Sequence, residues 1–359
     1  MKARFFLLKT VLFAAFATAF ISCSDNDEPE VPVEKEWWQK EGAYILNQGK
    51  FTSNNAELGY YISEEKKYQE VFETANEGLK LGDTGQDMVI YGSKIYVAVY
   101  NSGIIRVLDR AGKQIQTIES KKNGTLQNPR YFTTYQGKVY VTYYDGYLAQ
   151  IDTTSLQVVK DVKVGNNPEY VTITNGKLYV ANSGGMNYPN YDKTVSVVDP
   201  ATMSKTKDIE VAPDPVQLLS DKEGDVYLIS WTYPNYTLQR IDGATDQVTT
   251  ITTAHFMAIN PAGDKIYGVV SPYSANPITA EFFTYDAVEE KLSQTSFVTD
   301  GTIVKSFCSL NVDPSNGDIY IGTSNSVESG DMYVFTSAGV LKDKFQVGLN
   351  VAGAFFPKN

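Results

Sequence analysis

The sequence is poor in histidine and cysteine, the residues on which many metal and catalytic sites depend. Its 359 residues include one histidine, His255, and two cysteines, Cys23 and Cys308. A single histidine excludes a histidine-cluster metal site and argues against a hydrolytic triad. Two cysteines cannot build a disulfide framework or a cysteine-based metal site. His255 lies in the strand-like run TTAHFMAIN, so we interpret it as a structural residue.

Positive charge is also scarce. Lys and Arg number 31 against 42 Asp and Glu, which gives a formal net charge of −11. Cleavage of residues 1–22 would remove Lys2, Arg4 and Lys9 but no acid, and the net charge would become −14. Such an acidic surface argues against nucleic acid or an anionic membrane surface as the partner.

Motifs for catalysis are absent as well. The sequence contains no phosphate-binding loop, no EF-hand-like calcium loop and no Gly-x-Ser-x-Gly elbow. Acids do occur in the segments that we expect on one face, but no spacing pairs two of them for acid–base chemistry. We therefore expect no enzyme, no catalytic residue, no metal and no catalytic cofactor. These scattered acids are Asp83, Asp87, Asp145, Asp192, Glu328 and Asp331.

The N-terminus has the pattern of a lipoprotein leader. Basic residues precede an almost entirely apolar run over 5–21, and Ser22-Cys23 follows. We predict a signal peptide over 1–22, lipidation of Cys23 and an acidic disordered tether over 23–36. An ordinary cleaved signal is the alternative. An acidic run directly after the lipidated cysteine resembles the surface-export signal of Bacteroidetes lipoproteins, which implies an outer-membrane, surface-exposed location.

A short motif recurs through the remaining residues, 37–359. A hydrophobic–Tyr–hydrophobic triplet returns every 39 to 53 residues, usually just after a Gly, Lys or Asp turn. Another strand follows the strand that contains each triplet, and several of these following strands end in aspartate. The tyrosines are Tyr44, Tyr96, Tyr140, Tyr179, Tyr227, Tyr267 and Tyr320, and the aspartates are Asp109, Asp152, Asp199, Asp242 and Asp286.

This repeat predicts an all-β, seven-bladed β-propeller. Two further strands fit between successive triplets, and four strands every 40–50 residues are typical of a propeller blade. After Tyr320 the chain holds two strands and then GLNVAGAFF, which resembles the segments that open other blades. The C-terminal strand should therefore close the ring by pairing with the N-terminal strands. A β-sandwich pair or a ring of six or eight blades is the alternative.

The connections differ between the two faces of such a ring. The turns between the first and second strands of each blade are short, as in QGK and KEGD. The connections between the second and third strands are long and rich in aromatic and amide side chains, as in NSGGMNYPNYDK at 182–193. Loops on a rigid scaffold often carry function. We predict a ligand-binding basin made by Phe51, Asn55, Tyr100, Asn101, Tyr143, Tyr144, Asp145, Asn182, Met186, Tyr188, Trp231, Tyr233, Tyr273 and Asn276.

Aromatic surface with adaptable amides suits a large, partly polar small molecule or a glycan. Tyrosine is abundant, at 25 residues, so some of these side chains will pack between blades instead of contacting a ligand.

The segments YILNQGKFTSNNAELGYY at 44–61 and LKLGDTGQDMVI at 79–90 resemble the opening motifs of the YncE-like, DUF5074 group of Bacteroidetes surface propellers. KLYVANSGG and KVYVTYYDG are similar to the YVTN-type repeat of that group. Where the family usually has Asn-Glu-Gly, this chain has Asn47-Gln48-Gly49. The resemblance covers residues 42 to about 357 and implies a surface propeller lipoprotein.

The resemblance also implies a ligand and a partner. One branch of the family, the BtuG branch, binds cobalamin and passes it to a TonB-dependent outer-membrane transporter. By resemblance we expect capture of cobalamin or a related corrinoid, a transporter of this kind as partner, and no homo-oligomer. The alternatives are a glycan-binding propeller, a protein-interaction scaffold and a propeller lyase or glycosidase.

Overall fold

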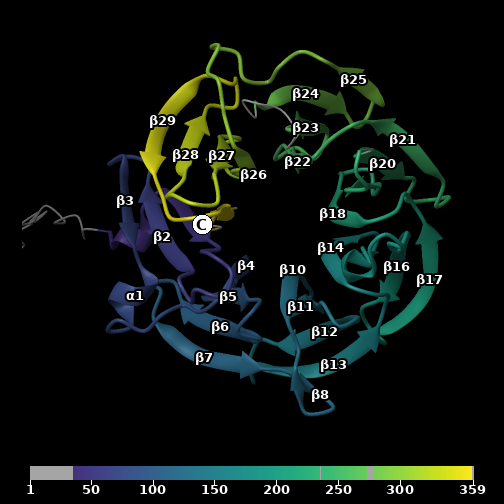
Figure 1. Cartoon of the computed structure of the whole chain (residues 1–359), viewed down its shortest axis with the longest axis horizontal. Coiled ribbons are helices and arrows are strands. Elements are labelled where there is room, and N and C mark those ends of the chain that lie inside the picture. Colours follow the sequence, from purple (N-terminus) through teal and green to yellow (C-terminus); the bar gives the residue numbers. More distant parts are fainter. Residues whose placement is uncertain (1–34, 235, 273–278, 358–359) are drawn as a thin grey trace, which may run out of the picture. The chain divides into compact units, whose positions relative to one another are not determined.

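The repeated segments fold as four-stranded antiparallel sheets arranged in a ring (Figure 1). The computed structural model describes residues 35–234, 236–272 and 279–357. These residues form seven four-stranded sheets, and in each sheet the strands follow one another outward from the ring axis. The prediction of a seven-bladed propeller is therefore confirmed.

Six of the blades are built from consecutive strands. In the blade that begins with β4, a small β8–β9 hairpin follows the outer strand β7. The strands of these blades are β4 (Gly85–Tyr91), β5 (Lys94–Val99), β6 (Ile104–Asp109) and β7 (Gln114–Glu119) with the hairpin β8 (Lys121–Lys122) and β9 (Thr125–Leu126); β10 (Pro129–Tyr135), β11 (Lys138–Tyr143), β12 (Tyr147–Asp152) and β13 (Gln157–Lys163); β14 (Pro168–Thr174), β15 (Lys177–Asn182), β16 (Thr194–Asp199) and β17 (Ser204–Glu210); β18 (Pro215–Ser220), β19 (Val226–Ser230), β20 (Thr237–Ile241) and β21 (Val248–Thr252); β22 (Phe256–Ile259), β23 (Lys265–Val270), β24 (Glu281–Asp286) and β25 (Lys291–Ser293); and β26 (Phe307–Val312), β27 (Ile319–Thr323), β28 (Asp331–Phe335) and β29 (Leu341–Gln346).

Helices are few in the described part of the chain. They are α1 (Phe72–Ala75) and the 3-10 turns η1 (Trp37–Gln39) and η2 (Gly185–Asn187). None of the described helices is long and apolar enough to span a membrane.

The remaining blade joins the two ends of the chain. It consists of β30 (Val351–Phe355) next to the axis, followed by β1 (Gly42–Asn47), β2 (Glu57–Ile62) and β3 (Lys67–Glu70). β30 and β1 run antiparallel, with Tyr44 opposite Phe355 (Figure 1). This confirms the predicted closure of the ring by the C-terminal strand, which ties the last blade to the first.

The repeated tyrosines fill the interfaces between blades. Each is at most 6% exposed and belongs to a hydrophobic cluster shared with the following blade. Tyr96, for example, clusters with Val139 and Val141 of the next blade. In the last blade Tyr320 clusters with β1 and lies edge-on to Tyr61 at 6.4 Å between ring centroids. The interval between tyrosines in the sequence thus reflects one inter-blade contact per blade.

The aspartates that end the third strands have a local role. The Asp152 Oδ1 accepts hydrogen bonds from the backbone N–H groups of Thr154 (3.1 Å) and Ser155 (2.8 Å). The Asp242 Oδ1 does the same with Ala244 and Thr245, at 3.0 and 2.7 Å. Aspartate side chains stabilise turns in this way, so these residues shape the turn into the outer strand.

Two buried tyrosines should respond in opposite directions when the hydroxyl is removed. The Tyr179 hydroxyl is buried and has no hydrogen-bond partner in the described structure. The Tyr61 hydroxyl donates to the Asp343 Oδ2 across the closing interface, at 2.6 Å. We expect Tyr179→Phe to raise the free energy of unfolding by about 1 kcal/mol and Tyr61→Phe to lower it by about 1.5 kcal/mol. Urea unfolding of both variants measures this, and shifts of the same sign would contradict it.

Candidate functional site

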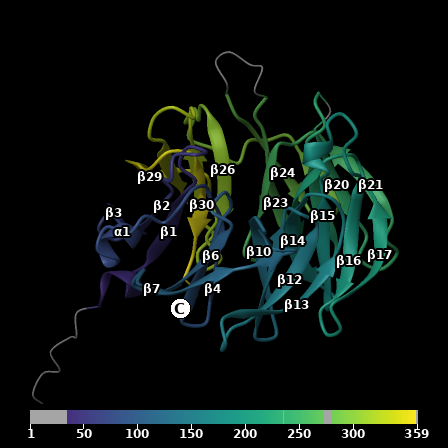
Figure 2. The same ribbon diagram turned by 60° about the horizontal axis from the view of Figure 1, so that its bottom comes forward.

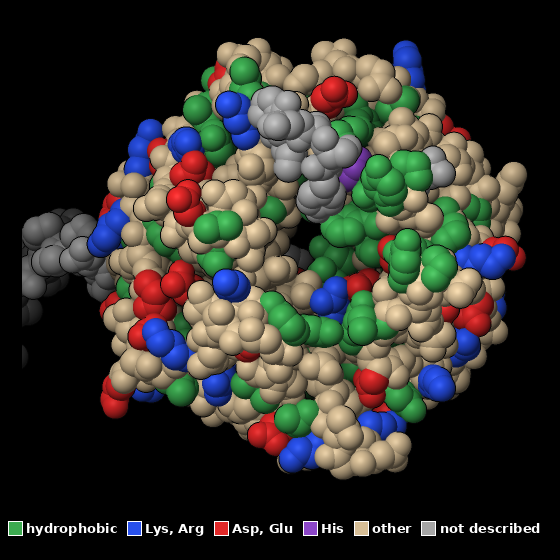
Figure 3. Space-filling model, viewed as in Figure 1, with side chains coloured by type: hydrophobic (Ala, Val, Ile, Leu, Met, Phe, Trp, Pro, Cys, Tyr) green, Lys and Arg blue, Asp and Glu red, His purple; other side chains and the backbone are tan. Residues whose placement is uncertain are grey.

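The connections predicted to carry function do gather on one face of the ring. We call it the loop face; it consists of the connections between second and third strands together with those between blades. The long connection 183–193 between β15 and β16 lies here, and so do the described ends of the connection between β23 and β24; residues 273–278 are outside the described residues. Figure 2 shows the ring tilted from the view of Figure 1. In Figure 3 the loop face has a central hollow, with hydrophobic side chains gathered at its margin, chiefly over β14 to β20.

β-Bulges turn side chains toward this hollow. Each inner strand except β22 has a register shift at its loop-face end. In β10, Pro129 pairs with Tyr143 and the next pair is Phe132 with Val141, so that Arg130 and Tyr131 together lie opposite Thr142 and β10 has one extra residue. Bulges redirect side chains and are frequent beside functional sites. The bulge residues all line the central cavity; they are Gln86, Arg130, Tyr131, Glu169, Tyr170, Val216, Cys308 and Ala352.

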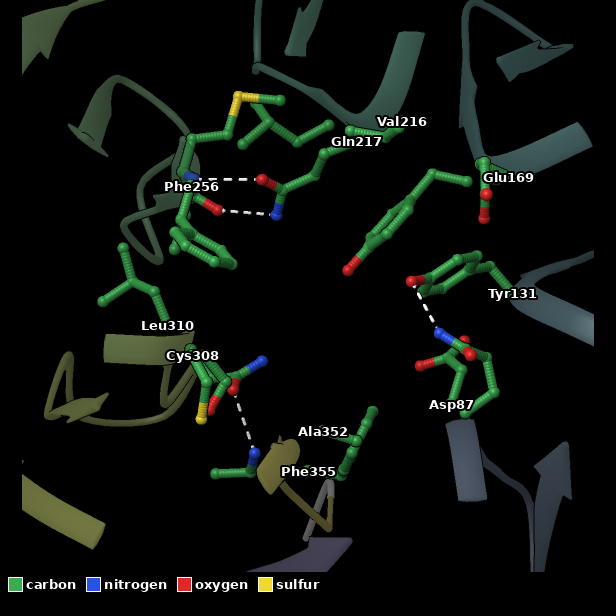
Figure 4. A pocket seen from close by; sticks show the side chains of 18 of the residues that line it. Asp87, Tyr131, Glu169, Val216, Gln217, Phe256, Cys308, Leu310, Ala352 and Phe355 are labelled. Atoms are coloured by element: carbon green, nitrogen blue, oxygen red, sulfur yellow. Dashed lines mark hydrogen bonds between the residues drawn. The ribbon is translucent and has the colours of Figure 1, made fainter. Parts of the chain in front are cut away.

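The central cavity has a volume of about 790 Å³ and two unlike halves. The blades that contain β4, β10 and β14 line one half with polar and aromatic groups. The blades that contain β18, β22, β26 and β30 line the other half mainly with apolar groups, among them Val216, Phe256 and Leu310. Figure 4 shows this division, with Asp87, Tyr131 and Glu169 on one side and Phe256, Leu310 and Cys308 opposite. A ligand that fills the cavity would therefore meet a polar and an apolar surface at once.

Arg130 organises the polar half. Its Nε donates to the Glu169 Oε2 at 2.8 Å, its Nη1 donates to the Gln86 Oε1 at 2.7 Å, and its Nη2 also bonds Glu169. The Gln86 Nε2 in turn donates to the Tyr131 hydroxyl at 2.7 Å. Such a buried ion pair holds its members in place, because removing one partner leaves an uncompensated charge at a cost of about 3–5 kcal/mol. The network is therefore formed by the protein's own side chains, without a ligand.

Burial raises the pKa values of three carboxyl groups here. The pKa of Asp87 rises to about 7, although the Phe132 N–H donates to its Oδ2 at 2.8 Å. Burial raises the pKa of Asp214 to about 6. The pKa of Glu169 is also raised, because burial outweighs the attraction of Arg130. Perturbed carboxyl groups in a cavity are common at functional sites. Among the described residues, no three of the His, Cys, Asp and Glu side chains are arranged to hold a metal ion.

Three of the sequence-predicted residues come together at the cavity. Tyr144 and Trp231 line it, and Tyr100 packs edge-on against Tyr144 at 5.7 Å between ring centroids. The guanidinium of Arg130 lies 5.0 Å from the Tyr100 ring centroid and 4.8 Å from that of Tyr144. The Trp231 Nε1 donates to the backbone oxygen of His255 at 3.0 Å, which fixes the indole at the apolar half.

Four further predicted residues are exposed on the loop face, outside the cavity. Met186, Tyr188 and Tyr233 are 75%, 79% and 73% exposed, and Phe51 is 59% exposed. They lie on the connections that follow β1, β15 and β19. Such exposure leaves their apolar surface free to contact a partner.

The exposed polar residues of the prediction stabilise their own surroundings. The Asn55 Oδ1 accepts from the Lys50 N–H at 2.8 Å, and the Asn101 Nδ2 donates to Asp83 at 2.9 Å. Asp145 accepts both of its hydrogen bonds from the Gln127 side chain. Their observed contacts are within or between loops.

Tyr143 and Asn182 were predicted to line the basin, but the structure buries both of them. They are 1% and 0% exposed. Both are the last residues of second strands and still pair with the inner strand, opposite Pro129 and Pro168. Tyr143 therefore packs into a core cluster, and the Asn182 Nδ2 donates to Ser196 inside the blade at 2.9 Å. Tyr273, Asn276 and Cys23 lie outside the described residues.

Most of the polar half of the cavity comes from residues outside the predicted basin. Gln86, Arg130, Glu169 and Tyr170 lie at the starts of inner strands, whereas the predicted basin was drawn from the long connections and the strand ends beside them. A repeated pattern in the sequence could have identified such residues. In the blade-opening segments NPR, NPE and DPV, the residue directly after the proline lines the cavity; these residues are Arg130, Glu169 and Val216.

Asp87 should make stability depend on pH. Its pKa in the folded protein is about 7, above the ordinary value of 3.8, so between about pH 4 and pH 7 the folded state holds the proton more tightly than the unfolded state. Stability due to Asp87 is therefore lost as the pH rises through this window. The unfolding free energy of Asp87→Asn should therefore rise relative to that of the wild type as the pH increases. Between pH 4.5 and 7.5 we expect this difference to grow by on the order of 1 kcal/mol or more.

Urea unfolding of both proteins across this pH range measures the difference. Asp152→Asn is the control. The hydrogen bond from Lys138 holds the pKa of Asp152 below its ordinary range, so the pH dependence of stability due to Asp152 lies below the pH range of this measurement. A difference between Asp87→Asn and wild type that stays constant with pH would contradict the assignment.

Comparisons with known proteins agree with this architecture. No curated protein sequence matches the chain. Solved structures with the same fold include a protein from Lactobacillus plantarum, at 16% identity and a TM-score of 0.64 over 89% of this chain and 100% of that one. They also include a putative 6-phosphogluconolactonase from Bacteroides fragilis, at 12% identity and a TM-score of 0.63 over 89% and 98%. At such identities the likeness shows the fold alone.

A family match covers nearly all of the propeller. Residues 41–357 match the family described as Domain of unknown function (DUF5074). The matched span begins just before β1 and ends just after β30, so that it takes in the closed ring. The chain therefore belongs to the DUF5074 family of propeller proteins.

Proposed function

We propose that this protein captures a small organic ligand at its loop face without converting it. The observation that carries the proposal is the central cavity of about 790 Å³, half polar and half apolar, below exposed aromatic side chains. Binding sites for small molecules typically measure about 300–1,000 Å³ and combine apolar walls with a few fixed polar groups. The network around Arg130 supplies such groups in a fixed arrangement.

A corrinoid such as cobalamin is the first ligand to test, by resemblance to the cobalamin-binding branch of the family. A corrinoid is larger than the cavity. Its ring would lie across the rim against Met186, Tyr188 and Tyr233, while one peripheral amide reached the polar half. Those three side chains are each more than 70% exposed, which supports contact with a broad, flat ligand.

The proposal extends to the location and the partner. Lipidation at Cys23 would anchor a monomeric propeller to the outer membrane, with residues 23–36 as the tether. A TonB-dependent transporter would then receive the ligand. The leader sequence supports the anchor, and the family resemblance supports the transporter.

A second candidate ligand is a glycan, and a specific observation favours it. Tyr188 and Tyr233 present rings that are 79% and 73% exposed. Exposed aromatic rings of this kind provide apolar faces on which sugars can stack. Binding would then be confined to the rim.

Calorimetric titration of the chain from Glu36 to Asn359 with cyanocobalamin tests the proposed ligand. We expect saturable heat with one site per chain. Trp231→Ala and Tyr188→Ala should each weaken binding about tenfold or more, because each removes an aromatic contact. Ile115→Ala is the matched control, since Ile115 is 49% exposed on the outer strand β7, away from the loop face.

Two outcomes would count against the assignment. Absence of heat at tens of micromolar protein would remove cobalamin and bring the glycan forward. Equal losses of affinity in Tyr188→Ala and in Ile115→Ala would contradict binding at the loop face.

A further inference from the structure

Asp214 is a buried carboxylate without a partner. It ends the connection between β17 and β18, lines the cavity and is only 9% exposed. Its backbone is fixed, because its N–H donates to the oxygen of Asp192 at 2.8 Å and its oxygen accepts from the N–H of Trp231 at 2.9 Å. Its side chain, in contrast, makes no hydrogen bond or ion pair with any described residue.

The cavity that Asp214 lines contains another acceptor without a hydrogen bond from any described residue, and the guanidinium of Arg130 is directed to other partners. Glu169 and Tyr144 line the same cavity as Asp214. Burial is the main cause that raises the pKa values of Glu169 and Tyr144, and the negative charge of Asp214 adds to it. Arg130 directs its hydrogen bonds to the Oε2 of Glu169 and to Gln86, so the Glu169 Oε1 accepts none of them.

This arrangement favours a positively charged group. A buried carboxylate without a partner is costly, and the cost falls when a cation or a hydrogen-bond donor arrives. Tyrosine rings attract cations through their faces, and Tyr144 already carries Arg130 at 4.8 Å from its ring centroid. The described carboxylates are not grouped to hold a metal ion, so an organic cation with N–H donors fits better.

We propose that Asp214, Glu169 and Tyr144 form a subsite for a protonated amino group of the ligand. The inference rests on one part of the proposed function, the capture of a small organic ligand in the cavity. It does not rest on a corrinoid, whose peripheral amides carry no positive charge. The ammonium group donates to the Asp214 carboxylate and to the free oxygen of Glu169. The apolar part of the ligand then lies toward Phe256 and Leu310, on the side of the cavity opposite Glu169.

Two probes that differ in one group test the subsite. They are 4-phenylbutylamine and 4-phenylbutan-1-ol, titrated into the purified protein at pH 7.5 and followed by ligand-observed NMR. We expect the amine to bind at least about tenfold more tightly than the alcohol, as for a charge-assisted hydrogen bond. Asp214→Asn should remove that advantage, because a neutral amide cannot make the charge-assisted hydrogen bond to the ammonium group.

The control variant is Glu223→Gln. It also removes one negative charge, but Glu223 is exposed in the turn between β18 and β19, away from the cavity. Loss of the amine's advantage in this variant too would show a general charge effect and overturn the subsite.

The remaining outcomes separate the inference from the proposed function. Equal affinities of the wild type for amine and alcohol overturn the subsite but keep the cavity as a ligand site. An unchanged preference for the amine in Asp214→Asn does the same. Absence of binding by both probes overturns the subsite together with the cavity as a ligand site.

Discussion

The structure depends on packing between neighbouring blades. A four-stranded blade is apolar on both faces and is buried only when it has a neighbour on each side. One tyrosine per repeat, from Tyr44 to Tyr320, lies in each of these interfaces. The same requirement forces the ring to close, because an open end would expose an apolar face. β30 and β1 meet this requirement by completing one blade from both ends of the chain.

The candidate site is a consequence of this closed ring. The inner strands converge on the axis, and the bulges at their loop-face ends turn side chains into the central space. The ring holds these side chains in place, and the loop residues Tyr100 and Tyr144 pack against Arg130 from the loop face. The surface loops then add exposed aromatic groups such as Tyr188 around an opening whose chemistry is already set by Arg130 and Glu169. The division into a polar and an apolar half follows from which blade contributes which bulge residue.

The fold could be predicted from the sequence because its main stabilising contact repeats in the sequence. The tyrosine interval revealed both the number of blades and the missing inner strand of the first blade. The site was harder, since a bulge is a feature of pairing between strands and leaves little trace in a single strand. Arg130 and Glu169 are therefore absent from the basin that the sequence predicts. Tyr143 and Asn182 were misplaced for a related reason: one residue at a strand end separates a buried position from a loop position.

In the proposed function, the ligand binds in the space enclosed by the inner strands. Ala352 lines the apolar half of this space at the bulge of β30, and Ala352→Trp would fill part of it from that side. Titration of this variant with 4-phenylbutylamine, alongside a urea unfolding curve, is the most direct test. The account predicts loss of binding with cooperative unfolding retained. Binding at wild-type affinity in a folded Ala352→Trp variant would contradict it.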